Sequence, residues 1–184
     1  LLRINDSPLV FDKEIFRPPY PNGRKGCYAM SNNLSSPHVV VFGVGPVGRE
    51  YCKVLQRLDV GFLVVGRSTA GTERFASKTG IKALPGGVEG WKDNADNNVE
   101  SAIVSVSLED LAQTAIDLMD CGIRNMLLEK PGGINAEEIG RVKDKAIATG
   151  TKVWIAYNRR FFASVLKAQE IIRDDGGVKS FNFE

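Results

Sequence analysis

Three glycines, Gly43, Gly45 and Gly48, have the spacing that binding of a dinucleotide pyrophosphate requires. They follow an apolar run over residues 38–42 and precede a helical pattern. The first glycine of such a turn allows a tight bend, the second leaves room for the phosphates, and the third lets the helix pack on the strand. Amides at the helix N-terminus then face the anion. The expected cradle comprises Gly43, Val44, Gly45, Pro46, Val47 and Gly48.

A glycine-rich turn that binds nothing has the same spacing, so the surrounding elements decide between the two. Expected strands cover residues 38–42, 61–65, 81–84, 99–106, 124–128 and 152–156, and another begins near residue 178. Expected helices cover residues 46–58, 72–79, 108–121, 136–149 and 161–174. Apolar strands that alternate with helices indicate a parallel sheet covered on both faces. We therefore predict an α/β, doubly wound, Rossmann-like sheet of order 3-2-1-4-5-6, with ligand at the carboxyl ends of strands 1 and 4.

Local patterns sharpen the expected helices. Apolar spacing predicts one buried face for residues 46–58. That face consists of Val47, Tyr51, Val54, Leu55 and Leu58. Asn135, Glu138 and Gly150 are the expected cap residues of the helix over residues 136–149. Residues 85–98 predict a loop-rich segment that can include one turn of helix around residues 88–91. The core is expected to include Trp91, Phe161, Phe162, Val165 and Leu166.

The N-terminal segment differs from the rest of the chain. Residues 1–37 hold five of the eight prolines and a polar tract at residues 22–26, which predicts an extended arm or linker. We expect the dinucleotide-binding domain to cover residues 38–177, and residues 178–184 to begin a second domain. Because the chain begins with Leu and stops within an expected strand, we expect it to be a fragment of a longer protein.

The composition is ordinary for a water-soluble domain, with 43% hydrophobic residues, 25% charged residues and a net charge of +2. This charge gives no reason to expect nucleic acid or an anionic membrane as a partner. The apolar runs are too short to span a membrane. The three cysteines, Cys27, Cys52 and Cys121, show no metal-like spacing. We therefore expect no metal, and reduced thiols in a cytoplasmic protein.

The residues after the expected strand over 61–65 bear on the choice of coenzyme. A carboxylate there commonly holds the ribose 2′-hydroxyl of NAD, whereas this chain reads Gly-Arg-Ser-Thr at residues 66–69. The Arg67 guanidinium suits a 2′-phosphate, and the Ser68 hydroxyl adds a donor. We expect NADP to be favoured over NAD. A solvated surface arginine and use of both coenzymes are the alternatives.

A second motif, Glu129-Lys130-Pro131, follows the expected strand over residues 124–128 and puts a cation at the carboxyl edge of the sheet. A third, residues 156–161, reads Ala-Tyr-Asn-Arg-Arg-Phe. With the glycine turn, these motifs resemble the Gfo/Idh/MocA family of glucose–fructose oxidoreductase and inositol dehydrogenase over residues 38–184. The resemblance extends to members that act in nucleotide-sugar or surface-polysaccharide biosynthesis.

The resemblance implies roles for the residues that follow the strands. Lys130, which alone would be an ordinary surface cation, would be catalytic, hydrogen-bonding the reacting sugar oxygen and assisting proton transfer. Glu129 would help hold the nicotinamide ribose and orient Lys130. Pro131 would fix the turn, for which a cis peptide bond is one means. The other implied coenzyme contacts are Ser105, Val106, Ser107, Asn158 and Arg159. Without the resemblance, Arg159 would be read as a helix cap or a partner for distant carboxylates.

The chain also departs from the family pattern. It lacks the histidine that usually follows the fourth strand, and it stops where the family's second, antiparallel domain begins. That domain supplies the substrate pocket, an Asp/His pair and the usual oligomer contacts. The resemblance therefore implies the nucleotide-binding part of an NAD(P)-dependent sugar or nucleotide-sugar oxidoreductase, inactive alone and oligomeric only with that domain. A non-catalytic dinucleotide-binding sensor or scaffold is the alternative.

Overall fold

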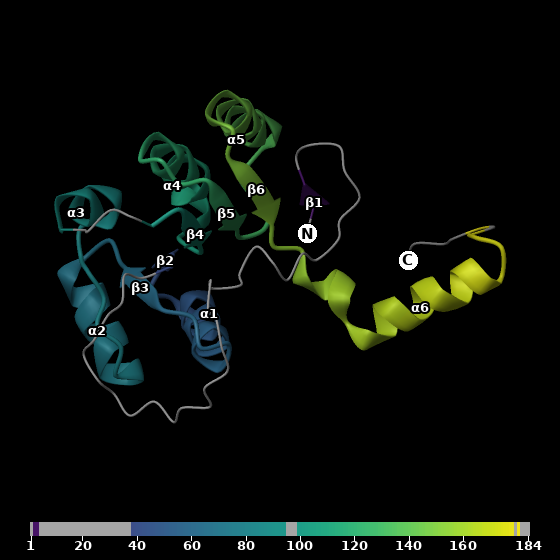
Figure 1. Ribbon diagram of the computed structural model, residues 1–184, viewed down its shortest axis with the longest axis horizontal. Helices are drawn as coiled ribbons and strands as arrows, with labels where there is room; N and C mark the ends of the chain where they lie inside the picture. The colour runs from purple at the N-terminus through teal and green to yellow at the C-terminus, as the bar shows by residue number, and fades with distance from the viewer. Residues whose placement is uncertain (1, 4–37, 95–98, 179, 181–184) are drawn as a thin grey trace, which may run out of the picture.

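The computed structural model describes residues 2–3, 38–94, 99–178 and 180. Its centre is a six-stranded sheet of order β1-β6-β5-β4-β2-β3 (Figure 1). The parallel strands are β2 (Val39–Phe42), β3 (Phe62–Val65), β4 (Ser101–Val104), β5 (Asn125–Leu128) and β6 (Lys152–Ile155). The short β1 (Leu2–Arg3) pairs antiparallel with β6. The expected doubly wound, Rossmann-like α/β fold is confirmed.

Helices cover the two faces of this sheet. They are α1 (Pro46–Arg57), α2 (Thr69–Thr79), α3 (Gly87–Asn94), α4 (Leu108–Asp120) and α5 (Ala136–Thr149). The 3-10 helix η1 (Asn158–Phe161) and α6 (Ala163–Asp174) follow β6. Alternate residues of β2 serve opposite faces, because successive strand side chains point in opposite directions. Val40 and Phe42 pack with α3, α4 and α5, whereas Val39 and Val41 pack with α1 and α2.

The third expected strand is almost absent. Only Leu84 of residues 81–84 pairs with the sheet, through a single parallel bridge to Val65. The expected third strand of the 3-2-1-4-5-6 order is therefore reduced to one residue, Leu84, which pairs with the outer edge of β3. The helical turn expected around residues 88–91 is part of a longer helix, α3, whose Trp91 is buried and packs edge-to-face on Phe42 at 5.6 Å between ring centroids.

The face predicted for α1 is correct only in part, at Leu55 and Tyr51. Gly48, Cys52 and Leu55 are its buried residues, and Tyr51 is half-buried. The exposed residues are Val47, Val54 and Leu58. The cause is the glycine turn: Gly48 must face the strand, so the residues one and two turns later, Cys52 and Leu55, face the sheet as well. Burial raises the pKa of the Cys52 thiol to about 11.

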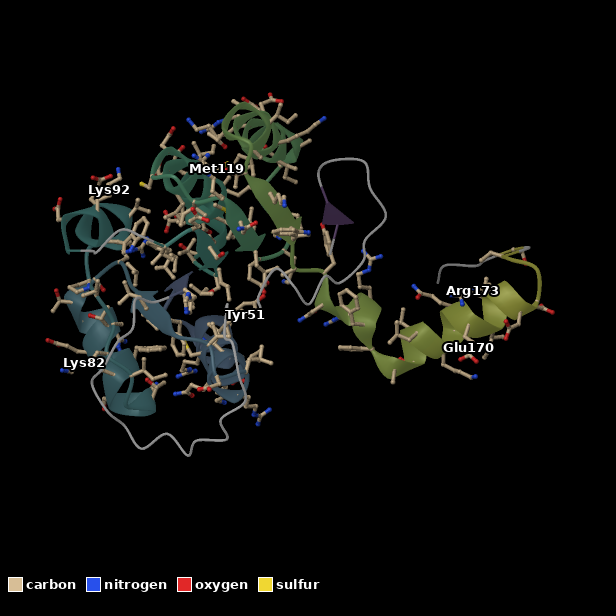
Figure 2. The ribbon with its side chains drawn as sticks, viewed as in Figure 1. Tyr51, Lys82, Lys92, Met119, Glu170 and Arg173 are labelled. Carbon is tan, nitrogen blue, oxygen red and sulfur yellow. The ribbon has the colours of Figure 1, made fainter. Side chains whose placement is uncertain are left out.

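The segment after β6 also exposes apolar side chains that were expected to be buried. The helix α6, yellow-green in Figure 1, extends away from the sheet. Every residue over 158–174 is at least partly exposed, including Phe161, Phe162 and Leu166, which were expected in the core. Figure 2 shows Glu170 and Arg173 on this helix, far from the sheet. This leaves an apolar surface on α6 that the described residues do not cover.

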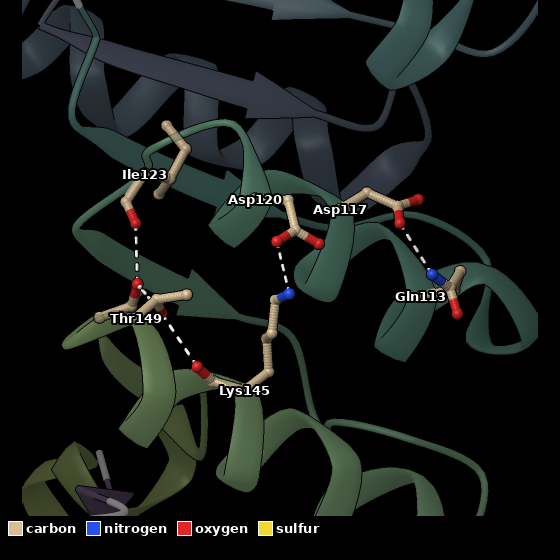
Figure 3. A network of polar contacts seen from close by, with 7 residues as sticks. Gln113, Asp117, Asp120, Ile123, Lys145 and Thr149 are labelled. Atoms are coloured by element: carbon tan, nitrogen blue, oxygen red, sulfur yellow. Dashed lines mark hydrogen bonds and ion pairs between the residues drawn. The ribbon is translucent and has the colours of Figure 1, made fainter.

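The caps expected for α5 are confirmed. The Glu138 N–H donates to Asn135 Oδ1 at 2.9 Å, and Gly150 is left-handed with a φ of 70°. The Glu138 side chain accepts from the N–H of Ile134. The neighbouring helices α4 and α5 are joined by an ion pair between Asp120 and Lys145 (Figure 3). These contacts fix the helices that cover the sheet beside the motifs of β4 and β5.

Two further predictions depend on residues that the structure mostly leaves undescribed. The arm over residues 1–37 lies outside the described residues except for β1. The strand expected from residue 178 lies outside them except for residues 178 and 180, which are irregular. The domain boundaries therefore stay predictions. Within the described residues, no helix has both the length and the apolar character needed to cross a membrane.

Candidate functional site

The ends of the five parallel strands lie side by side and fix the order of the residues that follow them. Val65, Phe42, Val104, Leu128 and Ile155 are paired in this order across the sheet. The segments that leave these strands carry, in the same order, Arg67, the glycine turn, Ser105 to Ser107, Glu129-Lys130 and Asn158-Arg159. Motifs far apart in the sequence thus share one edge of the sheet, where ligands of such folds bind.

The three glycines of the turn meet different surroundings. Gly43 has a φ of +124°, and a Cβ on it would lie 2.3 Å from the Ser105 carbonyl oxygen. A Cβ on Gly48 would lie 2.0 Å from the Gly43 carbonyl oxygen. A Cβ on Gly45 would meet nothing within 4 Å. Gly43 and Gly48 are therefore required for packing, whereas the absence of a side chain at Gly45 keeps open the space in front of the turn.

Free amides face that space at the start of α1. Gly45 is the N-cap and Pro46, which has no N–H, is the first helical residue. The Arg49 N–H donates to Gly45 O at 3.1 Å and begins the helical ladder. The N–H groups of Val47 and Gly48 precede it, so they are the donors that an anion at this helix end would receive.

A cleft of about 650 Å³ opens at this edge of the sheet. The predicted site residues that line it are Gly43, Val44, Gly45, Pro46, Val47, Arg67, Ser105, Val106 and Ser107. Ser105 is held by Phe42, whose carbonyl oxygen accepts from the Ser105 N–H at 2.7 Å and hydroxyl at 3.1 Å. An open cradle at Gly45 and unused helix amides beside a long cleft fit a dinucleotide.

Arg67 and Ser68, predicted to meet a 2′-phosphate, have partners within the protein. Arg67 Nη1 lies 2.7 Å from Asp110 Oδ2, across the cleft in the first turn of α4. The Ser68 hydroxyl caps α2 by accepting from the Gly71 N–H. Ser68 therefore does not line the cleft, while Arg67 does so as part of an ion pair.

Glu129 is held from two sides. The Tyr51 hydroxyl donates to Glu129 Oε1 at 2.6 Å, and the Lys130 N–H donates to Glu129 Oε2 at 3.2 Å. Burial, then the hydrogen bond to Glu129, raises the pKa of Tyr51 well above its usual range. The peptide bond between Lys130 and Pro131 is cis, and the Lys130 side chain is exposed. The backbone of the Glu-Lys-Pro motif is thus fixed while the ammonium group is free to reach outward.

A second hollow of about 310 Å³ adjoins this carboxylate and shares Val47 with the large cleft. Glu129, Tyr51 and Asn158 line it. Arg159 and Lys130 line neither hollow and are exposed. Arg160 lies over the Phe161 ring, with the guanidinium carbon 5.7 Å from its centroid. Of the residues predicted to meet the nicotinamide or substrate, Glu129 and Asn158 therefore lie together.

Two residues of the site, Tyr51 and Asp110, were not predicted as such. Tyr51 was assigned to an apolar face, although its hydroxyl donates to Glu129 and the residue lines the second hollow. Asp110 lies three residues after Ser107, a spacing that brings both to the start of α4. Figure 2 shows Tyr51 on α1. Within the described residues, no cluster of His, Cys, Asp or Glu is placed to hold a metal ion.

Comparison with known proteins identifies relatives of this fold. The model of the Gfo/Idh/MocA oxidoreductase family, NAD-binding Rossmann fold, matches residues 38–157. No curated protein matches the chain.

Solved structures resemble the chain at low sequence identity. A WlbA dehydrogenase from Bordetella pertussis, in complex with NADH and UDP-GlcNAcA, is 14% identical with a TM-score of 0.65, covering 74% of this chain and 41% of its own. UDP-N-acetylglucosamine 3-dehydrogenase GnnA from Acidithiobacillus ferrooxidans is 17% identical with a TM-score of 0.59, covering 72% and 42%. A provisionally assigned NADPH-dependent oxidoreductase from Desulfitobacterium hafniense is 19% identical with a TM-score of 0.66, covering 79% and 42%. The chain thus spans less than half the length of these structures.

Proposed function

The chain belongs to the Gfo/Idh/MocA oxidoreductase family with an NAD-binding Rossmann fold, and we propose that it is the coenzyme-binding part of an NAD(P)-dependent sugar or nucleotide-sugar oxidoreductase. The observation that carries this proposal is the shared sheet edge, where the glycine turn, Ser105 and Glu129 follow three neighbouring strands. A bound nicotinamide coenzyme accepts or donates the hydride, and the protein supplies binding and orientation.

The proposed roles follow the order of the strand ends. The amides of Val47 and Gly48 hold the pyrophosphate in the space that Gly45 leaves open. The residues after β4, Ser105 to Ser107, support the coenzyme in the middle of the cleft. At the reacting end, Glu129 and Asn158 orient the nicotinamide ribose or the substrate.

Lys130 is the proposed catalytic residue, with Arg159 as a further contact to the nicotinamide or substrate. The Lys130 side chain is exposed, and the Glu129 carboxylate holds the Lys130 backbone by accepting a hydrogen bond from its N–H group. As the ammonium, the Lys130 side chain can donate a hydrogen bond or a proton to the oxygen of the reacting sugar carbon, and as the neutral amine it can accept a proton from that oxygen. Arg159, in η1, is likewise exposed and lies on the adjoining segment.

The substrate class follows from the relatives. Two of the similar structures are a dehydrogenase in complex with UDP-GlcNAcA and a UDP-N-acetylglucosamine 3-dehydrogenase. A nucleotide sugar is therefore the first substrate class to test, and a free sugar the second. We further propose that a second domain completes the substrate pocket and that oligomers form through it. The cysteine pattern supports a cytoplasmic location.

The coenzyme preference is proposed from the cleft residues. Arg67 lines the cleft after β3, where such folds bind the ribose that carries the 2′-hydroxyl or 2′-phosphate. Its guanidinium supports NADP, with NAD as the alternative coenzyme. The similar structures include a complex with NADH and a provisionally assigned NADPH-dependent enzyme, so relatives use both.

A fluorescence titration with NADH and NADPH tests the binding proposal. Gly45→Ala should weaken binding of both coenzymes about tenfold or more, because the added methyl group enters the pyrophosphate space. Gly61→Ala is the matched control, since a Cβ there also meets nothing within 4 Å but lies away from the cleft. Both variants should unfold at nearly the wild-type urea concentration. Absence of binding to either coenzyme by the folded wild type would refute the proposed function.

A further inference from the structure

An ion pair between Arg67 and Asp110, called the clasp below, joins two walls of the cleft. Arg67 comes from the loop after β3, and Asp110 lies in the first turn of α4, yet Arg67 Nη1 and Asp110 Oδ2 are 2.7 Å apart. Both residues line the cleft. The pair is exposed, at 82% for the Arg67 side chain and 45% for that of Asp110, so an incoming ligand can reach both groups.

Each half of the clasp is anchored independently. Asp110 Oδ2 also accepts from the Ser107 hydroxyl, and the Asp110 N–H donates to Ser107 O at 3.1 Å. The Arg67 carbonyl oxygen accepts from the Gly86 N–H at 3.2 Å, which ties the arginine loop to the start of α3. The carboxylate is therefore held facing the arginine by its own helix.

The charges around the clasp oppose a second anion. Among the described residues that line the cleft, the charged side chains are one cation, Arg67, and three carboxylates, Glu89, Asp110 and Asp117. Glu89 is neutralised by Lys92 at 2.8 Å. A 2′-phosphate would have to compete with Asp110 for the guanidinium and would then lie beside that carboxylate. A 2′-hydroxyl carries no charge and leaves the pair intact.

We propose that Asp110 is a specificity-determining residue that offsets the preference for a 2′-phosphate that Arg67 alone would confer. The proposal rests on the coenzyme binding proposed above and deepens it. With the clasp closed, Arg67 is engaged by Asp110, and the advantage of the coenzyme with the 2′-phosphate is reduced. Removing the Asp110 charge frees the guanidinium for that phosphate.

Calorimetric or fluorescence titration with NADH and NADPH tests the clasp through dissociation constants alone. Asp110→Asn keeps an oxygen for the Ser107 hydroxyl and removes the charge. The dissociation constant of NADH divided by that of NADPH should rise about tenfold, because NADPH binding is favoured. In an Arg67→Ala background the same substitution should shift the ratio less than about twofold, since the competing partner is gone.

Asp117→Asn is the matched control. Asp117 lines the same cleft, but its carboxylate accepts from Gln113 at 2.7 Å, within α4 (Figure 3). Its substitution should shift the ratio much less than that of Asp110. An equal shift in the two variants, or an Asp110→Asn shift that persists without Arg67, would overturn the clasp. Binding of both coenzymes with an unchanged ratio in Asp110→Asn also overturns it, but leaves the proposed coenzyme binding standing.

Discussion

Tyr51 and Glu129 are joined by a hydrogen bond of 2.6 Å, although 78 positions separate them in the sequence. Tyr51 lies on the helix that the glycine turn begins, and Glu129 lies in the motif that carries Lys130. The bond therefore connects the proposed pyrophosphate site to the proposed catalytic lysine. Because Glu129 also accepts from the Lys130 N–H, a change at Tyr51 reaches the lysine backbone through a single side chain.

Tyr51→Phe should destabilise the protein by about 1–2 kcal/mol, since it leaves the Glu129 carboxylate without its phenol donor. Urea unfolding followed by circular dichroism measures this loss. Coenzyme affinity should fall only modestly, because the glycine turn stays intact. Tyr157→Phe is the control, as Tyr157 is 45% exposed. Equal stability of the wild type and Tyr51→Phe would mean that the hydrogen bond contributes nothing to folding.

The same bond predicts a stability change at alkaline pH. Burial and the hydrogen bond to Glu129 raise the pKa of Tyr51 above its ordinary value of 10.0. The unfolded chain loses this proton near pH 10, whereas the folded protein keeps it. The contribution of Tyr51 is therefore fully present below about pH 10 and is lost as the pH rises further. Urea unfolding between pH 8 and 11 should show the advantage of the wild type over Tyr51→Phe shrinking above pH 10; a constant difference would contradict the prediction.

Much of the fold could be predicted because its signals are local. The apolar runs fixed the five parallel strands, and Asn135 and Gly150 marked the ends of α5. The face of α1 could not be predicted from hydrophobicity, because its orientation is set by Gly48, whose missing side chain carries no apolar signal. The exposed Phe161 and Phe162 misled for the opposite reason: their hydrophobicity is evident, but in the structure they are 44% and 56% exposed rather than part of the core.

The site shows the same division between local and long-range information. Gly45 and Lys130 belong to contiguous motifs and were recognisable in the sequence. The partners of Arg67 and Glu129 were not, since Asp110 and Tyr51 reach them only after the sheet has been assembled. Side-chain pairs between distant segments leave no periodic pattern in a single sequence. The prediction of Arg67 as a phosphate ligand therefore omitted Asp110, the carboxylate that pairs with it.

Gly48→Ala should disrupt folding rather than merely binding. Its Cβ would lie 2.0 Å from the Gly43 carbonyl oxygen, and backbone atoms on both sides must move to relieve the clash. We expect a loss of about 1–3 kcal/mol or more in unfolding free energy. Gly140→Ala is the control, because Gly140 lies within α5 and a Cβ there meets nothing within 4 Å. That variant should gain about 0.5–1 kcal/mol, and similar unfolding midpoints for the two variants would refute the packing argument.

Lys130→Met should separate catalysis from binding. The substitution keeps the length of the side chain but removes the ammonium group that would donate to the sugar oxygen. In a form of the protein that turns over a sugar or nucleotide sugar, the rate constant kcat should fall about 100-fold or more, while the dissociation constant of the coenzyme stays within about twofold. Lys143→Met, at an exposed position of α5, controls for the loss of a surface charge. Unchanged turnover with intact coenzyme binding would remove Lys130 from the mechanism. The motif after β5, which the register of β4 and β5 places beside the residues after β4, would then serve coenzyme binding alone.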